Sequence, residues 1–214
     1  MGCSNEQTII NNREKYLDEL EKYQIILIIK TPCSSVESSL YKKICKEFNY
    51  HYLSTGDVLK KIFLEEKKDI ESLKTIEDIK KSILIPSNEV IEILKNEIFK
   101  INNNKKMFVD GFPRNLENME MWKNVMNGVT ILKKIIYIKI NKEEILKRIK
   151  EKNEIENFQN SQKYDNQLNI FNDNIVPLIE EIKKEDNLLE IDGMKNEEDI
   201  YKNLYQSIIK YKLF

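Results

Sequence analysis

Short apolar runs alternate with longer segments of helical periodicity along this chain. The runs lie at residues 25–29, 107–109, 135–140 and 188–191. Runs of this length are typical of parallel strands that are covered on both faces. Between them, apolar residues recur at helical spacing, as in Val90, Ile91, Leu94 and Ile98. Strands that alternate with helices predict an α/β fold with a doubly wound parallel sheet.

Candidate ligand-binding residues lie where the predicted strands end. Ligands of a doubly wound sheet bind at the carboxyl ends of its strands. Lys30 directly follows the first run, Asp110 directly follows the run at 107–109, and Gly56 follows Leu53 and its neighbours. We therefore expect a ligand site at this edge of the sheet.

The segment after the first run has the position of a phosphate-binding loop but lacks its residues. Such a loop uses glycines that turn backbone N–H groups toward phosphates, a lysine for the β and γ oxygens, and a Ser/Thr for magnesium. Here there is no glycine, Val36 stands at the position of the lysine, and Glu37 adds a carboxylate where a helix N-terminus attracts anions. Only Ser38 keeps a candidate role. The degenerate loop is Lys30, Thr31, Pro32, Cys33, Ser34, Ser35, Val36, Glu37 and Ser38.

Two other segments match the chemistry of a monophosphate site. Residues 53–57 read LSTGD and residues 109–114 read VDGFPR, and the two together at this spacing are a specific signal. With the loop before them, and with the segments 84–89, 146–149 and 189–193, their order resembles that of the adenylate kinase family. The resemblance covers roughly residues 25 to 212.

The resemblance implies one kinase-like domain at 25–214 with a five-stranded parallel sheet. It places a small helical insert for the nucleoside monophosphate at about 55–86 and a short lid at about 151–167. Residues 1–24 would form an N-terminal leader. No arginine follows Arg148, although the family places several in the lid to clamp phosphates, and lysine is a poor substitute there.

The resemblance also implies roles for single residues. Arg114, Asp110 and Arg148 would be the residual catalytic residues, with Arg114 facing the monophosphate. Asp110 would hold a magnesium-bound water in an active enzyme, together with Ser38 as the other metal residue, or would remain as a structural carboxylate. Lys60 replaces an arginine, and Asn118 replaces the glutamine that would read adenine. The nucleotide-binding residues would be Thr55, Gly56, Lys60, Ile85, Gly111, Arg114 and Asn118.

Two functions are compatible with these patterns. In the first, the protein is a pseudoenzyme with lost or strongly reduced ATP:AMP phosphotransferase activity that binds at most an AMP-like monophosphate and acts through an unknown protein partner. ATP binding is not expected in this case. In the second, it is an active but divergent adenylate or nucleoside monophosphate kinase in which Lys30 substitutes for the missing lysine. Only the second function requires magnesium, and ATP binding discriminates between the two.

Composition favours a single cytoplasmic domain. The chain has 214 residues and a formal net charge of −1, which gives no sign of a nucleic-acid surface. Its three cysteines have neither metal-ligand nor disulfide-framework spacing, as expected in a reducing compartment. No apolar stretch is long enough to span a bilayer. We expect a monomer.

The N-terminus carries a possible acylation signal. Gly2 would become the first residue once Met1 is removed, as N-myristoylation requires, and Cys3 beside it could be palmitoylated. Glu6 stands where the motif prefers Ser or Thr, so a short frayed leader is the alternative. A single myristoyl chain gives only marginal binding, so stable membrane association would need Cys3 as well.

Overall fold

Five parallel strands form one sheet in the part of the chain that the structure describes. The computed structural model describes residues 22–31, 38–66, 86–155 and 169–214. The order of the strands across the sheet is β2-β3-β1-β4-β5, with every neighbouring pair parallel. The strands are β1 Tyr23–Ile29, β2 His51–Ser54, β3 Lys106–Asp110, β4 Thr130–Lys139 and β5 Leu188–Asp192.

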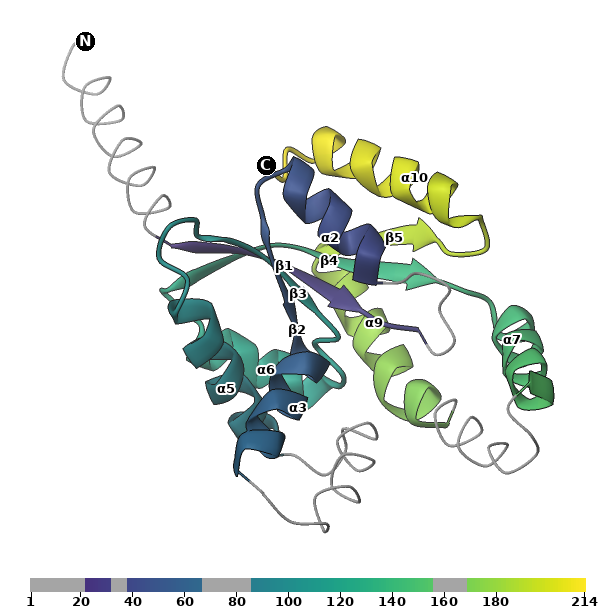
Figure 1. Ribbon diagram of the computed structural model, residues 1–214, viewed down its shortest axis with the longest axis horizontal. Helices are drawn as coiled ribbons and strands as arrows, with labels where there is room; N and C mark the ends of the chain where they lie inside the picture. Colours follow the sequence, from purple (N-terminus) through teal and green to yellow (C-terminus); the bar gives the residue numbers. More distant parts are fainter. Residues whose placement is uncertain (1–21, 32–37, 67–85, 156–168) are drawn as a thin grey trace.

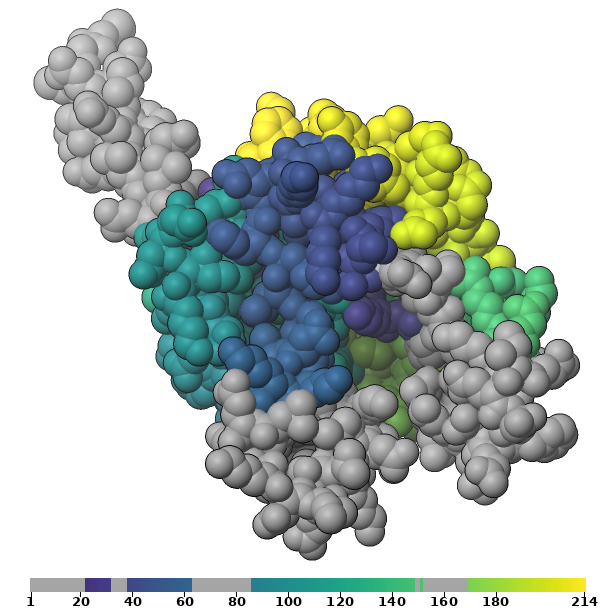
Figure 2. Space-filling model, viewed as in Figure 1, coloured from purple at the N-terminus to yellow at the C-terminus, as the bar shows by residue number. Residues whose placement is uncertain are grey.

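Helices connect the strands and cover both faces of the sheet. They are α2 Ser38–Glu47, α3 Thr55–Glu66, α5 Ser87–Phe99, α6 Leu116–Val125, α7 Lys142–Ile155, the π-helix η1 Phe171–Ile175, α9 Val176–Lys184 and α10 Glu197–Lys210. Helices α2 and α10 lie on one face, and α5, α6 and α9 lie on the other (Figure 1). Figure 2 shows α10, in yellow, beside α2 on the surface of the first face.

The central strand β1 supplies the middle of the core on both faces. Side chains alternate between the two faces of a strand. Ile25, Leu27 and Ile29 pack into the cluster with α5, α6 and α9. Ile26 and Ile28 pack into the cluster with α2 and α10. All five are fully buried, which explains why this strand is apolar without alternation.

The predicted doubly wound sheet is confirmed, and the strand positions agree closely with the apolar runs. One strand differs: β4 begins at Thr130, five residues before the run that predicts it. Residues 130–134 are only half-buried and include Lys133 and Lys134, so they do not read as an apolar run. They nevertheless pair with residues 23–26 of β1, and this pairing extends the strand.

Several predicted features lie outside the described residues. These are the acylation residues Gly2 and Cys3, the loop residues 32–37, Ile85 with most of the monophosphate insert, and the lid beyond residue 155. In the described segments, no helix is both long and apolar enough to cross a membrane.

Candidate functional site

Three neighbouring strands end at one edge of the sheet and bring two charged residues into contact. Strand β3 lies between β1 and β2, and Ser54 at the end of β2 pairs with Asp110 at the end of β3. Lys30 directly follows β1, and its Nζ lies 2.7 Å from Asp110 Oδ2. The Asp110 side chain is fully buried, whereas that of Lys30 is 50% exposed. Lys30 and Asp110, which the sequence places at this edge of the sheet, form an ion pair.

Asp110 has a second partner on β2. The Tyr52 hydroxyl donates a hydrogen bond to Asp110 Oδ2, the same oxygen that contacts Lys30. Burial raises the pKa of Tyr52, and the hydrogen bond to Asp110 raises it further, so Tyr52 stays a protonated donor. Asp110 Oδ1 is buried and has no hydrogen-bond partner among the described residues. One carboxylate oxygen is thus held by two donors, and the other is closed to solvent.

With Lys30 in contact with Asp110, this edge of the sheet does not fit a magnesium ion. Mg²⁺ prefers six oxygen ligands, most of which water can supply, so one carboxylate can hold it, but an ammonium group in contact with that carboxylate repels it. Asp110 Oδ2 already faces Lys30, and Asp110 Oδ1 is closed to solvent. Ser38, the other expected metal residue, begins α2 and is half-buried. Within the described ranges, no group of three or more His, Cys, Asp or Glu residues could hold a metal ion.

The turn after β3 holds Arg114 against the sheet. Gly111 has φ of 78°, a conformation that favours glycine. Its N–H donates to Ile28 O at 3.0 Å, and its carbonyl accepts from Arg114 Nε at 2.9 Å. Burial lowers the pKa of Arg114, and the negative charge of Asp110 opposes that shift. Phe112 is fully buried and packs on Trp122, with ring centroids 5.3 Å apart, which anchors the turn.

The side chain of Asn118 forms hydrogen bonds to two other residues of the protein. Its Oδ1 accepts a hydrogen bond from the Arg114 N–H at 3.1 Å. Its Nδ2 donates to the Ser87 hydroxyl at 2.8 Å, which links the start of α6 to the start of α5. The residue is 6% exposed. Each end of the amide makes one hydrogen bond within the protein, and the side chain is nearly fully buried. Asn118 therefore orients the Arg114 turn and offers little surface to a base.

The predicted nucleotide-binding residues of α3 differ in exposure. Thr55, the first residue of α3, is 1% exposed, and its hydroxyl has no hydrogen-bond partner in the segments described. Gly56 follows it and is half-buried. Lys60 is exposed. Ser54 Oγ accepts from the Asp57 N–H at 3.3 Å and caps the helix.

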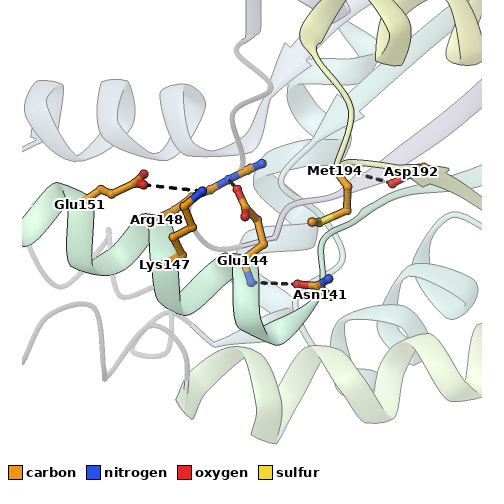
Figure 3. Close-up of polar contacts among 7 residues, drawn as sticks. All are labelled: Asn141, Glu144, Lys147, Arg148, Glu151, Asp192 and Met194. Carbon is orange, nitrogen blue, oxygen red and sulfur yellow. Dashed lines mark hydrogen bonds and ion pairs between the residues drawn. The ribbon is translucent and has the colours of Figure 1, made fainter.

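Arg148 projects from α7 and pairs within its own helix. Its Nε donates to Glu144 Oε1 at 2.7 Å, and Figure 3 shows both side chains extending from the same side of α7. The Asn141 side chain accepts from the Glu144 N–H at 2.8 Å and caps the start of the helix. Arg148 is thereby held beside a carboxylate.

Thr31, which follows Lys30, forms a hydrogen bond to strand β4. The Thr31 hydroxyl donates to Ile138 O at 2.6 Å, and Thr31 is buried. This contact directs the chain from β1 toward the neighbouring strand. It also fixes the backbone beside Lys30.

Three residues that contact the predicted site were not predicted from the sequence. They are Tyr52 beside Asp110, Ser87 beside Asn118, and Glu144 beside Arg148. Glu144 could have been found, because residues four apart on a helix are neighbours. Tyr52 could have been found from strand alternation, since it lies two residues before Ser54 on β2.

The sequence is similar to those of known kinases. The family model for adenylate kinase matches residues 31–187. UMP-CMP kinase 1 of Oryza sativa subsp. japonica is 26% identical over 194 residues, which cover 91% of this chain and 77% of that relative. An adenylate kinase of Rickettsia bellii is 28% identical over 206 residues, which cover 82% of this chain and 95% of that relative.

The fold and the strand-end motifs define the class of adenylate kinase-like nucleoside monophosphate kinases. Members of this class share a parallel sheet covered by helices on both faces, as the chain has (Figure 1). The match to the family model spans most of the chain, and the chain belongs to the adenylate kinase family.

Proposed function

We propose that this member of the adenylate kinase family is a pseudoenzyme that binds a nucleoside monophosphate through Arg114. Its transfer of phosphate from ATP to that ligand is lost or strongly reduced. The observation that carries this proposal is the state of Asp110, which is held by Lys30 and Tyr52 instead of being open to a magnesium-bound water.

The composition of the phosphate loop supports the same proposal. Phosphoryl transfer depends almost entirely on positioning and on stabilisation of charge in the transition state. Loss of one preorganised donor costs a factor of about 10² to 10³ in rate. Here the loop has no glycine, the lysine position holds Val36, and no arginine follows Arg148 in the predicted lid. These losses together predict a rate several orders of magnitude below that of an intact kinase.

The Arg114 side supports retention of a monophosphate site. The guanidinium is fixed by its bond to Gly111 O, and the turn is fixed by Asn118. A preorganised guanidinium is well suited to a phosphate group. The amide of Asn118 is occupied, so we propose that the site does not select adenine strongly and takes an AMP-like monophosphate with a weak base preference.

The activity test is a coupled assay of ATP-to-AMP transfer. We expect turnover far below the kinase range of roughly 1 to 100 per second. Assays with CMP and UMP should be equally slow. Turnover in the ordinary range with any of the three would support the alternative, an active kinase that uses Lys30, and would refute the pseudoenzyme.

The binding test is calorimetric titration with AMP, CMP, UMP and ATP. We expect the monophosphates to bind with similar affinity and more tightly than ATP, and we expect Arg114→Ala to abolish their binding. Lys123→Ala is the matched control, because it removes one positive charge from an exposed pair with Glu185. Unchanged AMP binding in Arg114→Ala, or tighter binding of ATP than of AMP, would contradict the proposed site.

A further inference from the structure

We propose that the Lys30 ammonium takes the place of a divalent cation at Asp110, so that this strand-end site holds the phosphate of its ligand without magnesium. The identity of the ligand rests on the proposed function. The replacement of the divalent cation by Lys30 does not rest on it, because it depends only on the contact between Lys30 and Asp110.

Lys30 contacts the buried carboxylate of Asp110. Its side chain is half-exposed, whereas that of Asp110 is fully buried, and the ammonium lies 2.7 Å from Oδ2. The ammonium therefore occupies one of the positions from which a cation could bind this oxygen. Tyr52 donates to the same oxygen, so Oδ2 already has two donors.

The strand geometry places the ammonium at this position. Ile26 and Ile28 of β1 face α2 and α10, and Lys30 continues the alternation toward that face. On β3, Phe108 faces the same way, and Asp110 continues its alternation. Ile26 pairs with Phe108, so the register places Ile28 beside Asp110. Lys30 lies two residues further along the same face, and its long side chain reaches Asp110.

The local charge does not favour a divalent cation. Lys30 is in contact with Asp110, and the charge of Asp110 acts on Arg114, while Asp57 acts on Tyr52 nearby. The two cations offset the two carboxylates, so no net negative charge is left to attract Mg²⁺. An ammonium group has three N–H donors, so Lys30 can bind Asp110 and a phosphate oxygen together.

Paramagnetic Mn²⁺ tests this proposal without any nucleotide. Mn²⁺ takes the same oxygen ligands as Mg²⁺ and broadens the amide signals of nearby residues. In the wild-type protein we expect the Asp110 and Gly111 amide signals to keep their intensity when Mn²⁺ is added below stoichiometry. In Lys30→Ala both signals should be lost, and a further Asp110→Asn change should restore them.

Lys139→Ala is the matched control, since Lys139 also lies at a strand end and pairs with Glu190 at 3.6 Å. We expect it to behave as the wild type. Selective loss of the Asp110 and Gly111 signals in the wild type would overturn the proposal, as would unchanged signals in a folded Lys30→Ala. If Lys30→Ala does not fold, Lys30→Met replaces it, and the wild-type measurement alone can still overturn the proposal.

Titration with AMP separates this inference from the proposed function. We expect the same dissociation constant in EDTA and in excess Mg²⁺, and a loss of roughly tenfold in Lys30→Met because a charge-assisted hydrogen bond is removed. If AMP does not bind at all, the proposed function fails, while the Mn²⁺ measurement still decides the replacement of the cation. AMP binding that requires Mg²⁺ in the wild type would overturn this inference and leave the monophosphate site intact.

Discussion

Asn118 joins two helices to the turn that carries Arg114. Its side chain accepts from the Arg114 N–H, and it donates to Ser87 on α5. The backbone N–H of Asn118 in turn donates to the side chain of Asn115, the N-cap residue of α6, at 2.7 Å. A buried polar residue with this many partners costs free energy when it is truncated, because the groups left behind lose their hydrogen bonds.

We expect Asn118→Ala to lower the free energy of unfolding by about 2 kcal/mol, because the Ser87 hydroxyl and the Arg114 N–H each lose a buried partner. Urea unfolding of this variant, of Ser87→Ala and of the double variant measures the coupling, which should be about 1 kcal/mol. Asn103→Ala, on an exposed loop, is the control and should change stability by less than about 0.5 kcal/mol. Strictly additive losses would show that the Asn118–Ser87 bond contributes nothing.

The pair of Lys30 and Asp110 was within reach of sequence reasoning, whereas the pair of Asn118 and Ser87 was not. Two residues that follow neighbouring parallel strands must lie at one edge, so the first pair requires only the strand assignments. Asn118 and Ser87 belong to different helices, 31 residues apart in the chain. Their contact depends on how α5 packs against α6, which hydrophobic periodicity does not specify.

Helix α10 has an N-terminal cap in which one side chain makes two hydrogen bonds. The Asn196 side chain accepts from the Asp199 N–H at 2.9 Å, and its Nδ2 donates to Asp199 Oδ2 at 2.9 Å. Glu197, Glu198 and Asp199 place negative charge in the first turn, where the helix dipole favours it. The opposite face of α10 buries Ile200 and other apolar residues against the sheet.

We expect Asn196→Ala to lower the free energy of unfolding by about 1 kcal/mol, because an N-terminal N–H of α10 loses its acceptor. Asn196→Ser keeps a capping oxygen and should retain most of the stability. Chemical denaturation of the two variants beside the wild type provides the comparison. Equal losses in both would indicate that the asparagine acts through something other than its cap.

The π-helix η1 shows how an element can escape prediction. The structure has η1 at Phe171–Ile175, followed directly by α9 at Val176–Lys184. Pro177 has no N–H and cannot donate to the carbonyl four residues before it. The Val176 N–H instead donates to Phe171 O, five residues back. Apolar spacing alone does not distinguish this arrangement from a regular helix.

At the scale of the whole molecule, one face of the sheet carries a cluster of buried tyrosine hydroxyls and a buried thiol that keep their protons. Burial raises the pKa of the Cys45 thiol on α2 to about 12, and the charge of Asp110 adds to the shift. Burial likewise raises the pKa of Tyr41, Tyr50 and Tyr52. Tyr41 and Cys45 are almost fully buried in the cluster beneath α2 and α10. These groups keep their protons in the folded state at a pH where the unfolded chain would lose them.

The sign of the resulting pH dependence follows from proton counting. The ordinary pKa is 9.0 for a thiol and 10.0 for tyrosine, and the pKa values of Cys45 and Tyr41 are raised above these in the folded protein. Above about pH 9 the unfolded state therefore binds fewer protons than the folded state, so the free energy of unfolding falls as pH rises. For Cys45 the stabilising contribution is fully present below pH 9 and is lost as the pH rises toward about 12, while the contribution of the tyrosines declines from about pH 10 upward. Each group that ionises only on unfolding adds a slope of about 1.4 kcal/mol per pH unit.

Urea denaturation at a series of pH values measures this effect. We expect the contribution of these groups to the free energy of unfolding to stay constant up to about pH 9 and then to decline because of Cys45. Above pH 10 the decline should become steeper because the tyrosines contribute as well. Cys45→Ala should make the decline between pH 9 and 10 shallower without removing it, because the unfolded tyrosines also begin to ionise in that interval, and it should leave the steeper part unchanged. Tyrosinate absorbance from the buried Tyr41 and Tyr50 should appear together with unfolding, since their hydroxyls ionise only after the chain opens. An equally steep decline between pH 9 and 10 in Cys45→Ala and in the wild type, or ionisation of these two tyrosines in the folded protein, would contradict this account of the buried cluster.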